Sequence, residues 1–198
     1  PKGVVNAVSG RGSVTGAVLA DHPDVDMISL TGGLETGRTI MQTAARTMKK
    51  VSLELGGKSP NIIFADADLD KALPFALKAI FMNAGQLCTV GSRLVLEESL
   101  VDTFLPRLKA AVEKLRPGWC LDEATDLGPV ISQEQMDKIL GYIESGRQCS
   151  RLITGGHRLT EGGLDKGFYI APTILLDPPM DAKVVQEEIF GPVLVVQT

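Results

Sequence analysis

The sequence has few of the residues on which several large classes of protein depend. Its 198 residues include two histidines, three cysteines and one tryptophan, and no two cysteines form a C-x-x-C pair. Zinc clusters and redox dithiols are therefore disfavoured. Three separated thiols favour a reducing compartment, which predicts a cytoplasmic protein.

Long apolar segments and excess positive charge are also missing. No run approaches the roughly 18 apolar residues of a membrane span, and the first residues, PKGVVNAVSG, lack the apolar stretch of a signal peptide. The net charge is −4 and the isoelectric point about 5.2. This charge argues against a broad phosphate-binding surface, so we expect neither a membrane nor a nucleic acid as a partner.

What the sequence does contain is an alternation of strand-like and helix-like segments. Residues 26–31 and 50–55 are rich in aliphatic and β-branched side chains and predict strands, and residues 35–48 between them predict a helix. This order predicts a βαβ unit. Two glycines, Gly56 and Gly57, follow its second strand and predict either a domain boundary or an ordinary strand-ending turn.

A second series of elements follows these glycines. Asp68 is a plausible N-cap for a helix with a regular apolar face, although Pro74 lies inside that pattern and predicts a kink or a delayed start. We expect further helices at 99–115 and 132–147, and strands at 61–65, 92–97, 169–176 and 192–197. The chain as a whole is predicted to be α/β with a mostly parallel sheet.

Cys88 is the cysteine in the most suggestive context. It follows a helical stretch that ends at Gly85, and its neighbours Thr89 and Gly91 are small or polar. A thiol there can project into a cleft, where backbone N–H groups could receive an oxyanion. A free cysteine is more often a small buried hydrophobe, and that interpretation is kept for Cys120 and Cys149.

A cysteine nucleophile needs a base, and the histidines do not supply one. His22 follows an apparent helix end and His157 lies in a glycine-rich turn, so both are expected at the surface. Glu54 ends an otherwise uncharged apolar strand, VSLELGG, where desolvation could raise its pKa for base catalysis. The alternative is an outward-facing carboxylate at a strand end.

Two glycine-containing loops precede helices. Residues 31–37 (TGGLETG) and 10–13 (GRGS) suit a phosphate or a nicotinamide near a helix N-terminus, but neither is a G-x-G-x-x-G fingerprint. On these residues alone, a plain turn without a ligand is the better explanation of each loop.

These segments together resemble the aldehyde dehydrogenase superfamily along the full chain. The resemblance is carried by DVDMISLTGGLETGR, VSLELGGKSPNIIFADADLDKAL, NAGQLCTVGSR, LGPVIS, GFYIAPTIL and EEIFGPV, and most specifically by ELGGKSP and GQLC. It implies the C-terminal part of a Rossmann-like dinucleotide-binding domain at 1–56. Most of an α/β catalytic domain, with the nucleophilic cysteine, then follows at 57–198.

The resemblance also implies a chemistry and its residues. Cys88 is the nucleophile that forms a thiohemiacetal with the aldehyde, and Glu54 activates the water that hydrolyses the resulting thioester. The cofactor is NAD or NADP. The residues implied to contact it are Gly12, Ser13, Gly32, Gly33, Thr36, Leu55, Glu188 and Phe190, with Glu188 holding the nicotinamide ribose. No metal is implied.

The resemblance has departures as well as matches. Gly33 stands where the family more often has serine, and Leu87 and Val90 flank the cysteine with unusual side chains. Family chains are much longer, so the resemblance implies that an oxyanion-hole asparagine and a C-terminal region lie outside these residues. We therefore expect little activity from the 198 residues alone, and a homodimer or homotetramer for the complete enzyme.

Three other functions compete with this hypothesis. A coenzyme-A-acylating relative is disfavoured because that branch lacks a water-activating glutamate at the position of Glu54. A non-catalytic fragment with intact motifs remains open. A cysteine hydrolase is disfavoured because neither histidine is placed for a Cys-His dyad.

Overall fold

The computed structural model describes residues 1–198, which form two compact units. The N-terminal unit is Pro1–Gly56 and the C-terminal unit is Gly57–Thr198. Neither Gly56 nor Gly57 adopts a positive φ, so the change of unit does not use the left-handed backbone that glycine permits.

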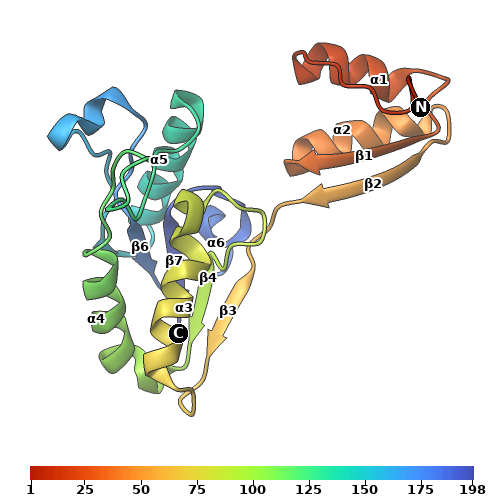
Figure 1. Ribbon diagram of the computed structural model, residues 1–198. Helices are drawn as coiled ribbons and strands as arrows, with labels where there is room; N and C mark the ends of the chain where they lie inside the picture. Colours follow the sequence, from red (N-terminus) through yellow and green to blue (C-terminus); the bar gives the residue numbers. More distant parts are fainter. The chain divides into compact units, whose positions relative to one another are not determined.

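The N-terminal unit is built around one βαβ motif, as the sequence predicts (Figure 1). Strands β1 (Met27–Gly32) and β2 (Lys50–Leu55) are parallel, and helix α2 (Leu34–Ala45) connects them. A π-helical turn, η1 (Gly12–Gly16), runs into the short helix α1 (Ala17–Asp21). Small residues let α2 approach the strands: a Cβ added to Gly37 would lie 3.0 Å from a Leu55 methyl group.

The C-terminal unit contains a five-stranded sheet in the order β3-β4-β7-β6-β5. The strands are β3 (Pro60–Ile63), β4 (Arg93–Leu96), β5 (Arg151–Thr154), β6 (Thr173–Leu176) and β7 (Val193–Gln197). All neighbours are parallel except β5 and β6, which are antiparallel. The predicted α/β class with a mostly parallel sheet is confirmed.

Helices cover this sheet and form one apolar core with it. They are α3 (Leu69–Phe81), α4 (Val101–Val112), α5 (Gln133–Arg147) and the short α6 (Lys183–Gln186), and α3 packs on α4 while α5 packs on α6. Every residue of β6 and β7 is buried. Because alternate side chains of a strand face opposite sides of the sheet, both faces of these two strands are covered.

Capping explains where two of these helices begin. The Asp68 side chain accepts hydrogen bonds from the backbone N–H groups of Asp70 and Lys71, so α3 starts where predicted and Pro74 does not delay it. The Ser132 hydroxyl accepts from the backbone N–H of Gln135, so α5 begins at Gln133.

The helix predicted at 99–115 is more divided, and the strand predicted at 169–176 is shorter, than expected. The helix predicted at 99–115 is a 3-10 turn, η3 (Glu98–Leu100), followed by α4, which ends at Val112. The strand predicted at 169–176 begins at Thr173, because Pro172 has no N–H for a ladder and its carbonyl lies against Gly155.

No helix in the chain combines the length and apolar character needed to cross a membrane.

Candidate active site

Cys88 lies in a loop that leaves α3 through an unusual backbone turn. Helix α3 ends at Phe81, and the 3-10 turn η2 (Met82–Gly85) follows it. Asn83, Ala84 and Gly85 have φ values of 53°, 54° and 70°. Three consecutive left-handed residues reverse the chain sharply, and Cys88 follows in a turn with its side chain exposed.

The turn is held against a second loop by an approach that only glycine permits. A Cβ on Gly85 would lie 2.1 Å from the carbonyl oxygen of Gly191, and a Cβ on Gly191 would lie 2.5 Å from Ile139 on α5. Gly191 belongs to the segment that carries Glu188 and Phe190. The structure therefore brings the GQLC and EEIFGP motifs together, on the surface of α5.

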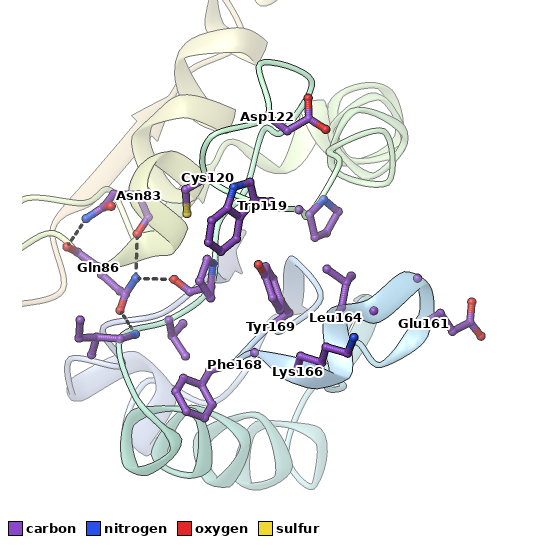
Figure 2. Close-up of a pocket in the computed structure, with 18 of the residues that line it drawn as sticks. Asn83, Gln86, Trp119, Cys120, Asp122, Glu161, Leu164, Lys166, Phe168 and Tyr169 are labelled. Atoms are coloured by element: carbon purple, nitrogen blue, oxygen red, sulfur yellow. Dashed lines mark hydrogen bonds between the residues drawn. The ribbon is translucent and has the colours of Figure 1, made fainter.

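Two glutamine side chains fasten these loops. Gln86 donates to the carbonyl oxygens of Asn83 and Pro129, at 3.2 and 3.4 Å, and accepts from the Ile131 backbone N–H at 2.8 Å (Figure 2). Gln135 on α5 donates to the carbonyl oxygens of Ile189 and Phe190, at 3.1 and 3.0 Å. Phe190 is held at a φ of 57°, a conformation that persists only where the surroundings enforce it.

The backbone around Cys88 offers unpaired donors. The N–H groups of Leu87, Cys88 and Thr89 donate to no backbone or side-chain acceptor. Unpaired N–H groups beside an exposed thiol are the arrangement needed to stabilise an oxyanion formed when that thiol adds to a carbonyl.

Glu188 lies in a charged and partly buried environment. Its Oε1 atom is buried and has no hydrogen-bond partner. Burial raises the pKa of the Glu188 carboxyl, whereas Lys138, the backbone N–H of Gly57 and Lys58 act in the opposite direction. Next to it along the chain, Glu187 accepts a hydrogen bond of 2.6 Å from the Tyr142 hydroxyl. An unpaired buried carboxylate oxygen is suited to accept hydroxyl groups from a ligand.

The N-terminal unit gathers a different set of candidate residues. Because β1 and β2 are parallel and in register, Thr31 lies beside Glu54 and Gly32 beside Leu55. Gly33 follows as the N-cap of α2, with Thr36 exposed in the first turn of that helix. The glycine loop, Glu54 and Leu55 therefore meet at the carboxyl ends of the two strands.

Two expectations for this unit are modified. Glu54 is exposed, so the burial that the sequence-based argument assumed for it is absent from this unit. Gly12 and Ser13 begin the π-helical turn η1 and not a regular α-helix. Both are exposed, and Ser13 lines a shallow cavity with Arg46 and Asp21.

A cavity of about 1130 Å³ lies within the C-terminal unit (Figure 2). Gln86 and Phe190 line it together with Trp119, Cys120 and Tyr169, but Cys88 does not. The prediction that Cys120 and Cys149 are buried is wrong, because both are exposed. Cys120 lies in a turn against Gly128, and Cys149 follows the last turn of α5, where its thiol reaches two backbone carbonyls.

Comparison with known proteins assigns the family. The sequence profile of the Aldehyde dehydrogenase family matches residues 1–198. The chain belongs to the aldehyde dehydrogenase family. A family relative, betaine aldehyde dehydrogenase of Bacillus subtilis (strain 168), is 47% identical in an alignment 199 positions long that covers 100% of this chain and 41% of that enzyme.

Solved structures of the family agree in fold. A betaine aldehyde dehydrogenase double mutant from Staphylococcus aureus, in complex with NAD+, has a TM-score of 0.97 and 40% identity, over 100% of this chain and 40% of that one. An aldehyde dehydrogenase of Bacillus cereus, also an NAD+ complex, has a TM-score of 0.90 and 39% identity, over 96% and 38%. The chain thus spans about two fifths of the length of these family members.

Four residues with roles in the site were not predicted from the sequence. They are Lys58, Gln86, Gln135 and Lys138. Gln135 had a visible signal, since Ser132 and Gln135 form the S-x-x-Q pattern of a helix start. The other three are recognised only by their contacts and charges in the folded unit.

Proposed function

We propose that these residues are part of an enzyme that oxidises an aldehyde to a carboxylic acid, with NAD+ or NADP+ as oxidant. The observation that carries the proposal is the Cys88 loop: an exposed thiol beside unpaired N–H groups, held against the loop of Glu188 and Phe190. Family membership and relatives solved with NAD+ support it.

The residues fit a dinucleotide at two places. The unpaired, buried Oε1 of Glu188 is suited to accept a ribose hydroxyl, and Phe190 lies two residues away. In the N-terminal unit, Gly32 and Gly33 precede α2, whose N-terminus is suited to a phosphate, with Thr36 in its first turn and Leu55 beside Gly32. Gly12 and Ser13 are assigned to the adenine side. The bound cofactor would supply the hydride acceptor.

Cys88 and Glu54 carry the remaining chemistry. The Cys88 thiolate adds to the aldehyde carbon, and the carbonyl electron pair moves to oxygen, where the Cys88 N–H stabilises it. Loss of hydride from that carbon leaves a thioester on Cys88. Glu54 takes a proton from water as the water attacks the thioester, and the carbon–sulfur bond breaks to release the acid and the thiolate.

We further propose that the 198 residues alone have little activity. The N-terminal unit has two strands, and its buried apolar side chains are those of Ala20 and Ala44. A cofactor site needs groups held within about half an ångström, which so small a core does not ensure. We propose that the complete enzyme is a homodimer or homotetramer. We also propose that it is cytoplasmic, because three unpaired thiols suit a reducing compartment.

The proposal is tested in the longest natural polypeptide that contains these residues. Glu54→Gln keeps the shape of the side chain but removes the base, so we expect a burst of NADH and then turnover slowed by about 10²–10⁴-fold. Cys88→Ser should abolish the burst, and Glu98→Gln, at an exposed glutamate, serves as the control. Unchanged steady-state oxidation in Glu54→Gln would remove Glu54 from the mechanism. The isolated 198 residues, assayed in parallel, should show no burst.

A further inference from the structure

Five buried polar atoms in the C-terminal unit have no hydrogen-bond partner, and four of them come from three neighbouring segments. These four are Lys58 Nζ, Ser92 Oγ, Arg93 Nε and Glu188 Oε1, and the fifth is Arg158 Nε. Buried polar atoms are nearly always paired in folded proteins, so a group of unpaired ones calls for a functional explanation.

The sheet topology explains why these segments meet. Strands β3, β4 and β7 are parallel neighbours, so the residues that precede them lie at the same edge of the sheet. Lys58 lies two residues before β3, Arg93 begins β4 opposite Pro60 and Val195, and Glu188 lies in the loop that leads into β7. The topology therefore brings an ammonium, a guanidinium and a carboxylate together.

The charges of this group act on one another without direct pairing. Lys58 and Glu188 form no ion pair within 4.0 Å, yet Glu188 raises the pKa of Lys58 and Lys58 lowers that of Glu188. Burial is the larger effect on Lys58, and with the like charge of Arg93 it lowers the Lys58 pKa to about 8. Lys138 on α5 also faces Glu188, and the neighbouring Tyr142 and Glu187 form a hydrogen bond.

A buried lysine without a partner destabilises a fold, and an apolar side chain of similar length would fill the same space at lower cost. Glu188, in contrast, needs a nearby positive charge and not an apolar neighbour. Burial favours its neutral form, whereas accepting two ribose hydroxyls requires the carboxylate. Lys138 and Lys58 both help to meet that requirement, because a positive charge in a poorly solvated region acts over more than a hydrogen-bond distance.

We propose that Lys58 is a positioning residue that keeps Glu188 ionised and oriented toward the nicotinamide ribose. This inference rests on the proposed function only for the identity of the ligand. The interaction between Lys58 and Glu188 stands on the geometry of the C-terminal unit.

The first test measures NAD+ binding by the natural polypeptide between pH 5 and 10. In the wild type, affinity should fall at low pH as Glu188 gains a proton. Lys58→Met should move this decline to higher pH and so weaken binding on its acid side. Lys58→Arg should restore the affinity, because arginine stays charged over this range. Lys78→Met, at an exposed lysine on α3, should change nothing.

A double mutant identifies the route of the effect. If Lys58 acts through Glu188, Lys58→Met should weaken binding no further once Glu188→Gln is present. Additive losses, or an unchanged pH profile in Lys58→Met, would overturn the inference.

The second test needs no cofactor and separates the two proposals. The Tm of the unliganded wild type and of Glu188→Gln is measured from pH 4.5 to 8. The part of the pH dependence that is present in the wild type and absent in Glu188→Gln reports the ionisation of Glu188. Lys58→Met should move the midpoint of that pH dependence to higher pH. A moved midpoint with unchanged NAD+ binding in Glu188→Gln would support the role of Lys58 while refuting the ribose assignment. An unmoved midpoint would refute the role of Lys58, whatever NAD+ does.

Discussion

Both units are built from α-helices and β-strands, but they reach very different degrees of burial. In the N-terminal unit, β1 and β2 contain only half-buried and exposed residues, and only alanines are fully buried among its apolar side chains. In the C-terminal unit, β6 and β7 have no exposed residue. A sheet of two strands has no interior strand, whereas one of five strands covered on both faces has several.

This difference extends to the candidate site residues. Those of the N-terminal unit lie on exposed strand ends and turns, with open space around Gly33 and Gly12. Those of the C-terminal unit are fixed by a glycine–glycine contact, two glutamine clamps and a set of buried charges. The C-terminal unit therefore defines the positions of its functional groups by packing, and the N-terminal unit defines its own by local backbone geometry.

The largest expected effect comes from adding one methyl group where the C-terminal unit is tightest. Gly85→Ala adds a Cβ 2.1 Å from the Gly191 carbonyl oxygen, at a φ of 70°, so we expect destabilisation by about 4 kcal/mol or more and loss of any activity. Gly16→Ala in the N-terminal unit meets nothing within 4 Å, and its helical backbone suits alanine, so it should stabilise by roughly 0.5–1 kcal/mol. Urea denaturation measures both. Equal effects of the two changes would contradict the contrast between the units.

A core truncation should give the next largest difference. Ile174→Ala empties a fully buried site in β6 and should cost about 2–5 kcal/mol. Ile28→Ala makes the same chemical change in β1, where the side chain is only half-buried, and should cost about 1 kcal/mol. Hydrogen exchange should report each loss in its own unit. Similar losses would mean that β1 is covered as thoroughly as β6.

The elements of this fold were predictable because each leaves a local signal. The βαβ motif at residues 26–55 has apolar strands around a periodic helix, and Asp68 caps α3 through its own side chain. The turn at Asn83 and Ala84 could not be predicted, because neither residue requires a left-handed backbone. It is enforced by the contact of Gly85 with Gly191, more than a hundred residues further along the chain.

The candidate site residues also divide into those that the sequence predicted and those that it did not. Cys88 and Glu188 were predicted as site residues through motif resemblance, and the exposure of the Cys88 thiol agrees with its expected accessibility. Exposure of Cys120 and Cys149 was not foreseen, because residue type alone favours burial for a cysteine. Lys58 was missed because its significance depends on Arg93 and Glu188, which only the order of the strands brings near it.

Two buried lysine ammonium groups, one in each unit, extend the comparison of the units to the pH dependence of stability. Lys49 in the N-terminal unit is buried, but its ammonium donates to the His22 carbonyl, whereas buried Lys58 Nζ has no partner. The folded pKa of Lys58 is about 8 and its ordinary value is 10.5. Below pH 8 both the folded and the unfolded chain hold the proton, and the burial cost is fully present. Between pH 8 and 10.5 only the unfolded chain holds it, so stability rises with pH.

Lys58→Met should therefore stabilise the C-terminal unit at pH 7 by about 1–3 kcal/mol, and the gain should shrink as the pH approaches 10. Lys49→Met should lose stability at pH 7, because it removes a hydrogen bond. Chemical denaturation at pH 7, 8.5 and 10 measures both variants. A gain for Lys58→Met that did not change with pH would show that its ammonium carries no burial cost.

The smallest expected effect concerns the three thiols, all of which belong to the C-terminal unit and all of which are exposed. Exposure alone predicts equal alkylation. Cys149 differs because its thiol lies 3.5 Å from the Ser145 and Gly146 carbonyl oxygens, and Cys120 differs because Gly128 lies against its sulfur. Cys88 has neither constraint, so brief iodoacetamide treatment followed by peptide mass mapping should find it modified a few times faster. That rate ratio corresponds to roughly the free energy of one weak hydrogen bond.

Ile28→Ala should leave all three rates unchanged, since its damage is confined to a unit without cysteines. Ile174→Ala should raise the rates at Cys120 and Cys149 toward that at Cys88, because loosening the C-terminal core releases both thiols from their contacts. Equal rates in the wild type would show that these contacts do not limit reaction, and a changed pattern in Ile28→Ala would show that the two units do not respond independently.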